Sequence, residues 1–244
     1  MSATLSIEVK ICGLTDPATA ALAAEAGAHA IGFVFHPPSP RHLTPLRACE
    51  IAAALPPDVA RVGVFVEQPL EVILRTAETA GLTAVQLHGA YPGVTAAALA
   101  AHGLHLIVVL CSSGDALQLQ AQALPPTAGV LVECGRGVLP GGNGAIWNWA
   151  DASVLRRVRP FAVAGGLTPE NVGAALTASG ASAVDVSSGV ESRPGVKDPK
   201  RIRALIAAVR QTAAIGDGPI FGANLTSPPS AVDPTTCFPV FPTL

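Results

Sequence analysis

Short runs of apolar, largely β-branched residues recur along most of the chain, and alanine- and leucine-rich segments separate them. Runs of this length and composition predict strands rather than helices. Because the runs are apolar almost throughout and do not alternate with polar residues, we expect both faces of each strand to be buried, as in a parallel sheet. The eight predicted strands span residues 9–13, 30–35, 61–66, 84–89, 105–111, 129–134, 161–166 and 183–189.

The segments between these runs predict helices, most clearly at residues 16–27 and 198–214. Asp16 and Thr168 each place an N-cap oxygen before a proline, which suits the first helical position because its missing N–H costs nothing there. Eight strand–helix units predict an α/β protein with one closed (β/α)8 (TIM) barrel. An open doubly wound sheet is the alternative, but its GxGxxG fingerprint is missing after the first predicted strand.

The repeating pattern stops at residue 216, where proline and small polar residues take over. We therefore expect residues 1–215 to form the barrel domain and residues 216–244 to form a flexible C-terminal extension. The alternative is a strap that lies on the barrel and docks Phe221, Phe238 or Phe241 in a groove.

Composition narrows the class of protein. The chain has 244 residues, 50% of them hydrophobic, and a net charge of -2. It can bury a large core, and it offers no basic surface for nucleic acid. No apolar run reaches the roughly 18 residues that a membrane span needs, and the N-terminus has no signal-peptide pattern, so we expect a soluble cytoplasmic protein. Five cysteines without a CxxC pair predict no zinc site.

Polar residues collect at the C-terminal ends of the predicted strands, where barrel enzymes place their active sites. On the first strand Lys10 and Cys12 share a face, because side chains alternate along a strand. An ammonium near a thiol favours the thiolate, which makes Cys12 a candidate base or nucleophile. The alternative is a small buried side chain. Further candidates at strand ends are Gln86, His88, Glu133, Asp185 and Ser187.

Glycine-rich turns follow the last three predicted strands. Backbone N–H groups in such loops commonly bind phosphate in barrel enzymes, since glycine lets the backbone approach the anion closely. We therefore expect a small phosphorylated substrate. The predicted phosphate-binding residues are Gly142, Gly144, Gly165, Gly166, Ser187, Ser188 and Gly189.

Seven motifs together resemble one family. They are KICGLT, GFVFHPPSPR, VGVFV, QLHG, PGGNG, AGGLTPENV and DVSSGVESRPGVKD, in this order. At these separations they resemble the phosphoribosylanthranilate isomerases, (β/α)8 enzymes of tryptophan biosynthesis. The resemblance runs from Val9 to the last predicted helix and leaves only the C-terminal extension uncovered.

The resemblance implies an Amadori rearrangement of N-(5-phosphoribosyl)anthranilate to 1-(2-carboxyphenylamino)-1-deoxyribulose 5-phosphate. This reaction needs an acid and a base but no cofactor or metal. By the family pattern, Cys12 of KICG is the general base, and Arg41 of SPR meets the anthranilate carboxylate through its planar guanidinium. Asp185 would position the ribose or Arg41, and the substrate would also meet Lys10, Gln86 and His88.

One departure bears on the chemistry. The family's general acid is an aspartate at the end of the sixth strand, where this chain has Glu133. The extra methylene lengthens the reach by about 1.5 Å, and a misplacement of about 1 Å can cost on the order of 10²-fold in rate. Two functions are therefore weighed: a working isomerase, monomeric or homodimeric, with Glu133 as its acid, and a weakened or repurposed relative that binds a phosphorylated sugar.

Overall fold

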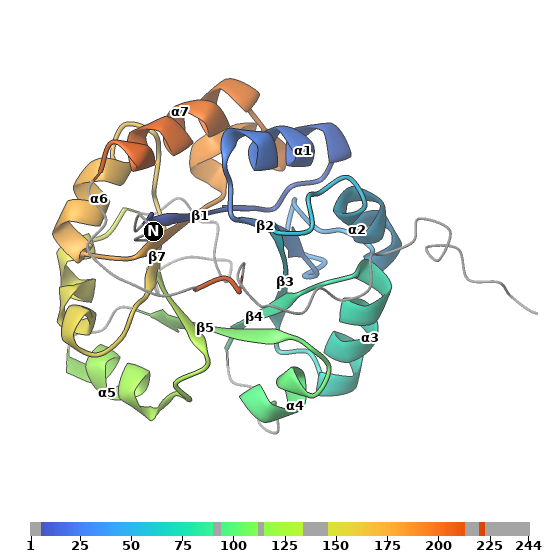
Figure 1. The fold of residues 1–244 in the computed structure, drawn as a ribbon, viewed down its shortest axis with the longest axis horizontal. Coiled ribbons are helices and arrows are strands. Elements are labelled where there is room, and N and C mark those ends of the chain that lie inside the picture. The colour runs from blue at the N-terminus through green and yellow to red at the C-terminus, as the bar shows by residue number, and fades with distance from the viewer. Residues whose placement is uncertain (1–5, 90–93, 112–114, 134–145, 213–219, 223–244) are drawn as a thin grey trace, which may run out of the picture.

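Eight parallel strands close into a barrel in chain order, β1 to β8, which confirms the predicted fold class (Figure 1). The computed structural model describes residues 6–89, 94–111, 115–133, 146–212 and 220–222. Each predicted strand is present with its ends shifted by a few residues. The strands are β1 (Glu8–Cys12), β2 (Ala30–Val34), β3 (Ala60–Val66), β4 (Ala84–His88), β5 (His105–Cys111), β6 (Gly129–Glu133), β7 (Ala162–Ala164) and β8 (Ala183–Val186).

Helices surround the barrel and cover the outer faces of the strands (Figure 1). The described α-helices are α1 (Pro17–Ala26), α2 (Pro45–Ala52), α3 (Leu70–Ala80), α4 (Ala96–Ala100), α5 (Asp115–Ala123), α6 (Val172–Ser179) and α7 (Pro199–Arg210). Between β6 and β7 the described helix is instead a 3-10 helix, η1 (Trp149–Arg157). Within the described parts of the chain, no helix has the length and apolar character that a membrane crossing requires.

The predicted helix starts are partly confirmed. The Asp16 side chain caps α1 by accepting the N–H of Thr19 at 2.8 Å. The start at Thr168 is wrong, because residues 169–171 form a turn and α6 begins only at Val172. The physical reason is local: Asn171 accepts the N–H of Thr168 and donates to the carbonyl of Gly166, which stabilises the turn. The last helix, α7, ends at Arg210 rather than at residue 214.

Alternation along the strands separates the large core outside the barrel from two smaller apolar clusters inside it. On β1, Val9 and Ile11 pack outward in the large core beneath the helices. Lys10 and Cys12, two residues apart, therefore share the inner face of the barrel, as predicted. The register sets Lys10 opposite Asp185 of the neighbouring strand β8. The polar side chains of Lys10 and Cys12 thus follow one another along the inner face of β1, toward the rim at the C-terminal ends of the strands.

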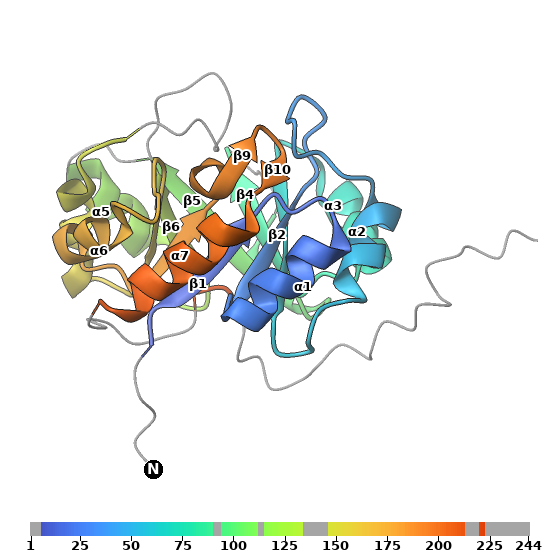
Figure 2. The ribbon, with the colours of Figure 1, turned by 90° about the horizontal axis from the view of Figure 1, so that it is seen from above.

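A small hairpin follows β8. A short 3-10 helix, η2 (Ser188–Val190), leads into β9 (Glu191–Arg193) and β10 (Val196–Lys197), which pair antiparallel before α7 begins. In the side view of Figure 2 this hairpin lies above the upper end of the barrel, over the strand ends. The fourteen-residue motif DVSSGVESRPGVKD therefore occupies one rim of the molecule.

Three residues of the C-terminal extension do not behave as a flexible tail. Ile220 and Phe221 are buried, at 2% and 0% exposure, and the segment lies within the ring of strands (Figure 1). At residues 220–222 the structure agrees with the alternative, in which Phe221 docks on the barrel, because apolar side chains of the extension find space inside the barrel. The remainder of residues 216–244 lies outside the described residues.

Candidate active site

A cavity opens at the C-terminal ends of the strands, and most of the predicted site residues line it. Because each strand ends at this rim, side chains far apart in the sequence meet there. The predicted residues that line the cavity are Cys12, Arg41, Gln86, His88, Glu133, Gly165, Gly166, Asp185, Ser187, Ser188 and Gly189. Gly142 and Gly144 lie outside the described residues.

Lys10 is placed differently from the prediction that it contacts substrate. Its side chain is fully buried, and its Nζ donates to Asp185 Oδ2 at 2.8 Å. Asp185 Oδ1 is buried and has no hydrogen-bond partner among the described residues. Since Asp185 also lines the cavity, this oxygen is free to accept a hydrogen bond from a bound ligand. Lys10 thus acts on the site through Asp185 and Cys12.

Two opposing effects set the pKa of Cys12. Burial raises the pKa of the thiol, and the charge of Lys10 opposes this without overcoming it. The expectation that Lys10 favours the thiolate has the right direction, but desolvation outweighs it. Burial also disfavours the ammonium of Lys10, yet Asp185 and Cys12 more than compensate, so the pKa of Lys10 is raised. The resting site therefore pairs a charged lysine with a protonated thiol.

Gln86, His88 and Glu133 form a chain of contacts across the cavity wall. Gln86 Nε2 lies 2.9 Å from His88 Nε2, and His88 Nδ1 lies 3.3 Å from Glu133 Oε1. When the Gln86 amide donates, neutral His88 accepts at Nε2 and carries its proton at Nδ1, facing the carboxylate. Both side chains are largely buried, so Glu133 is not a solvated residue at a strand end. The contact fixes where its longer side chain points.

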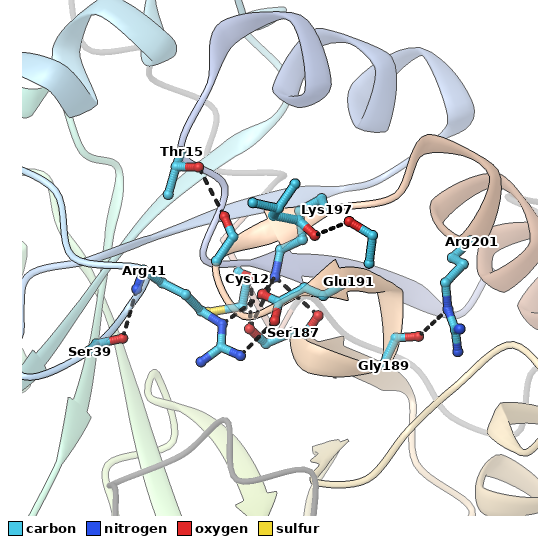
Figure 3. A network of polar contacts seen from close by, with 12 residues as sticks. Cys12, Thr15, Ser39, Arg41, Ser187, Gly189, Glu191, Lys197 and Arg201 are labelled. Carbon is cyan, nitrogen blue, oxygen red and sulfur yellow. Dashed lines mark hydrogen bonds and ion pairs between the residues drawn. The ribbon is translucent and has the colours of Figure 1, made fainter.

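Arg41 is positioned by a residue that the sequence reasoning did not single out. Its Nε and Nη2 donate to the two carboxylate oxygens of Glu191 at 2.7 and 2.8 Å (Figure 3). The expectation that Asp185 positions Arg41 is not met, because Asp185 pairs with Lys10. A guanidinium has five N–H groups, so three remain for a ligand carboxylate.

Lys197 completes this network from β10. Its Nζ donates to Glu191 at 2.7 Å and to the carbonyl and hydroxyl of Ser187 at 3.0 and 3.2 Å (Figure 3). Burial raises the pKa of Glu191, but Arg41 and Lys197 outweigh this and lower it, so the carboxylate is charged. Burial lowers the pKa of Lys197, and Glu191 offsets only part of the effect. The Glu191 carboxylate thus pairs with two buried cations, Arg41 and Lys197.

The hairpin that carries Glu191 and Lys197 is tied to the first strand. The Ser187 hydroxyl donates to the carbonyl of Cys12 at 3.0 Å, and the Thr15 hydroxyl donates to Gly195 at 3.2 Å. These residues lie in the motif DVSSGVESRPGVKD and in the loop after β1. Sequence reasoning missed Glu191 and Lys197. The available signal was that an acid and a lysine flank a Pro-Gly turn inside that motif.

The glycine turns after β7 and β8 bring backbone close to the cavity. Gly165 and Gly166 have φ of 84° and 67°, a left-handed conformation that disfavours other residues. At Gly189 a side chain would collide with the carbonyl of Leu167. The Ser187 hydroxyl is already bonded within the protein, so any anion here would meet mainly backbone N–H groups and Ser188.

The described residues contain no cluster of three or more His, Cys, Asp or Glu side chains placed to hold a metal ion. The chemistry of the rim rests on a thiol, two carboxylates, an imidazole and a guanidinium. This set suits proton transfer on an anionic substrate.

Comparison with known proteins identifies the family. The sequence model of the N-(5'phosphoribosyl)anthranilate (PRA) isomerases matches residues 9–208. An N-(5'-phosphoribosyl)anthranilate isomerase from Desulfatibacillum aliphaticivorans is 42% identical over 208 residues, covering 85% of this chain and 95% of the relative.

Solved structures agree. The phosphoribosyl anthranilate isomerase of Thermus thermophilus is 38% identical with a TM-score of 0.75, covering 84% of this chain and 98% of its own. A second isomerase, solved with reduced 1-(o-carboxyphenylamino)-1-deoxyribulose 5-phosphate, is 36% identical with a TM-score of 0.70, and the match covers 84% and 99% of the two chains. The chain therefore belongs to the N-(5'-phosphoribosyl)anthranilate isomerase family.

Proposed function

We propose that this protein is a working phosphoribosylanthranilate isomerase of tryptophan biosynthesis. It would convert N-(5-phosphoribosyl)anthranilate to 1-(2-carboxyphenylamino)-1-deoxyribulose 5-phosphate. The observation that carries the proposal is the joint position of Cys12 and Glu133 in one cavity, on strands β1 and β6, with Arg41 beside them. An acid and a base on separate walls can act on opposite sides of a bound sugar.

Cys12 acts as the general base in this proposal. Its thiolate removes the C2 proton of the ring-opened Schiff base, while the Lys10 ammonium beneath it favours the charged form. Asp185 keeps Lys10 in place through one oxygen and offers the other to a substrate hydroxyl. Lys10 is therefore buried and yet belongs to the site, because it acts through Asp185 and Cys12.

Glu133 acts as the general acid in its protonated form: one carboxyl oxygen gives its proton to the furanose oxygen, while the other oxygen still accepts the N–H of His88. Its extra methylene would leave an isolated carboxyl with more conformers than an aspartate has. The contact with His88 Nδ1 at 3.3 Å reduces that freedom and determines the direction of the carboxyl group. His88, oriented by Gln86, is therefore a positioning residue for a glutamate at this strand end.

Anion recognition divides between two regions. Arg41, held by Glu191, would receive the anthranilate carboxylate through its remaining N–H groups. The backbone of the Gly165-Gly166 and Ser188-Gly189 turns, with Gly142 and Gly144, would hold the phosphate. We also predict that the reaction needs no cofactor and no metal. We predict that the enzyme works in the cytoplasm as a monomer or a homodimer.

The test uses the purified protein and freshly prepared phosphoribosylanthranilate, with turnover followed as loss of anthranilate fluorescence. Because one base contributes about 10²–10⁴-fold, Cys12→Ala should reduce the rate by at least about 10²-fold. No turnover by the parent above Cys12→Ala would remove the isomerase function and leave sugar phosphate binding as the alternative. No observation in the structure favours that alternative.

Glu133→Gln tests the acid separately. The amide keeps the shape of the side chain but cannot donate the proton, so we expect a loss on the order of 10²-fold or more in kcat. Binding of the reduced product analogue should stay within a few-fold of the parent. A Glu133→Gln variant as active as the parent would show that another group is the acid.

A further inference from the structure

The larger apolar cluster inside the barrel, which extends from the lower end up to Ala164 at the active-site cavity, is built from unusually small side chains. Six of its nine barrel residues are alanine: Ala30, Ala60, Ala84, Ala162, Ala164 and Ala183; the other three are Val62, Ile107 and Leu131. Barrel interiors are normally filled by layers of bulky branched side chains. We call these nine residues the barrel floor. Alanines at these positions leave a space that strand side chains alone do not fill.

Residues of the C-terminal extension occupy this space. Ile220 and Phe221 belong to the same apolar cluster, and Phe221 is fully buried. The segment is held from opposite sides of the barrel: β1 binds its N–H groups, and β5 binds its carbonyl. Figure 1 shows residues 220–222 inside the ring of strands.

The polar contacts are specific for a peptide backbone. Glu8 Oε2 accepts the N–H of Ile220 at 2.8 Å and of Phe221 at 3.2 Å. His105 Nε2 lies 3.0 Å from the carbonyl oxygen of Ile220, which can only accept, so this ring nitrogen carries the proton. Glu8 is 7% exposed, and both hydrogen bonds that its side chain makes within the described residues are to this segment. Without the segment a buried carboxylate would lose its partners, which is costly.

The floor also makes room for the backbone of the segment. At Gly129, the first residue of β6, an added Cβ would collide with the carbonyl oxygen of Ile220. A glycine gives a strand no side chain to pack, and close approach of another backbone is one of its recognised uses. The segment then leaves by a left-handed Gly222, at a φ of 77° beside His105.

We propose that the barrel floor is a peptide-binding site whose ligand is the Ile220–Gly222 segment of the same chain. The site has a carboxylate for two successive N–H groups, an imidazole for the intervening carbonyl and an alanine-lined well for an aromatic ring. The family match ends at residue 208, before this segment. The extension is thus an addition to the family barrel that completes its core.

Amide hydrogen exchange of the full protein tests the docking without any substitution. The amides of Ile220 and Phe221 should exchange on the order of 10³-fold or more slowly than in an unstructured peptide, because their acceptor is buried. Exchange at the rate of an unstructured peptide would overturn the proposal.

Thermal unfolding tests whether the segment stabilises the barrel. Truncation of a buried phenylalanine in a chain of this size should lower Tm by roughly 10 °C. We expect this of Phe221→Ala, whereas Leu119→Ala, the truncation of an exposed apolar side chain on α5, should shift Tm by no more than about 1 °C. If Phe221→Ala does not fold, Phe221→Leu should still lower Tm by several degrees. Equal Tm values for parent, Phe221→Leu and Leu119→Ala would overturn the proposal.

Dilution identifies the chain that supplies the segment. An intramolecular ligand is present at the same effective concentration at any dilution. The difference in Tm between parent and Phe221→Ala should therefore stay constant over a hundredfold dilution. A difference that closes on dilution would mean that a second copy supplies the segment, which would overturn the assignment to the same chain.

Discussion

Cys12 shows how a single side chain can carry two opposing influences. Its position in the barrel interior excludes water and disfavours the thiolate, while Lys10 two residues before it favours the thiolate. Sequence spacing predicts only the second influence, since desolvation depends on what closes around the thiol. A base that rests protonated must give up its proton before it can act on the substrate.

Alkylation of Cys12 should report this balance. Because burial raises the pKa of the thiol, the rate of iodoacetamide labelling should increase about tenfold per pH unit from pH 7 to 9, without levelling off near the ordinary thiol pKa of about 8.5. Labelling is measured on the Cys12 peptide by mass spectrometry, with Cys12→Ser as the blank. A plateau below pH 8 would mean that Lys10 dominates.

Glu191 is the second residue whose role follows from its contacts. Glu191→Gln would leave Arg41 and Lys197 as buried cations without their anion, and removal of one partner from a buried pair costs about 3–5 kcal/mol. We expect Tm to fall by roughly 6–20 °C and KM to increase by about tenfold or more, with a smaller change in kcat. Arg193→Gln, an exposed charge change on the same hairpin, should alter neither. An unchanged KM in Glu191→Gln would show that the position in which Glu191 holds Arg41 does not matter for substrate binding.

Among the elements, the connection between β6 and β7 departs most from a regular barrel. A 3-10 helix stands where the repeating pattern predicts an α-helix. Two tryptophans anchor its start, as Trp147 donates to the carbonyl of Ala164 and Trp149 to that of Gly165. These bonds reach the end of β7, so η1 also supports the turn that lines the cavity.

Arg159, just after η1, joins this element to the preceding one. Its guanidinium donates to five backbone carbonyls near the end of α5 and before β6: Ala121, Leu124, Pro125, Pro126 and Ala128. Because hydrogen bonds to charged groups contribute about 1.5–3 kcal/mol, Arg159→Ala should lower Tm by roughly 5 °C. Arg157→Ala, an exposed arginine nearby, is the control. Equal effects of the two substitutions would mean that the carbonyl contacts contribute nothing.

Across the whole molecule, two half-buried histidines, His29 and His105, make stability depend on pH. The Val9 N–H donates to Nδ1 of His29, which must therefore be unprotonated, and His105 binds Ile220 in the barrel floor. Burial lowers the pKa of both side chains. In the unfolded chain they take up protons at a higher pH, near 6.5, than in the folded protein. The folded state therefore loses stability as the pH falls below about 6.5.

Urea unfolding at pH 7.5 and pH 5 measures this loss. We expect a lower midpoint at pH 5, and a smaller difference between the two pH values in His105→Gln than in the parent. His42→Gln, at an exposed position, should leave the difference unchanged. A parent midpoint independent of pH would contradict the neutral state of both rings.

Local pattern accounts for much of this protein. Strand positions, the closed barrel, the inner face of Lys10 and Cys12, and the rim location of His88 and Glu133 all follow from alternation and spacing, because these are properties of neighbouring residues. The false helix start at Thr168 arose in the same way, since a proline after a capping residue also suits the turn that precedes α6.

Contacts between distant parts of the chain were decided only by the closed barrel. Lys10 meets Asp185 across 175 positions, Arg41 meets Glu191 across 150, and Glu8 meets Ile220 across 212. Each pairing satisfies a buried charge, and sequence shows the charge without showing which partner barrel closure brings near it. The sequence by itself determined the barrel, its family and the rim that carries the chemistry. The tertiary structure decided which residue orients Arg41, how far burial opposes the Cys12 thiolate, and that the extension fills the barrel floor, because burial and long-range pairing exist only in the folded chain.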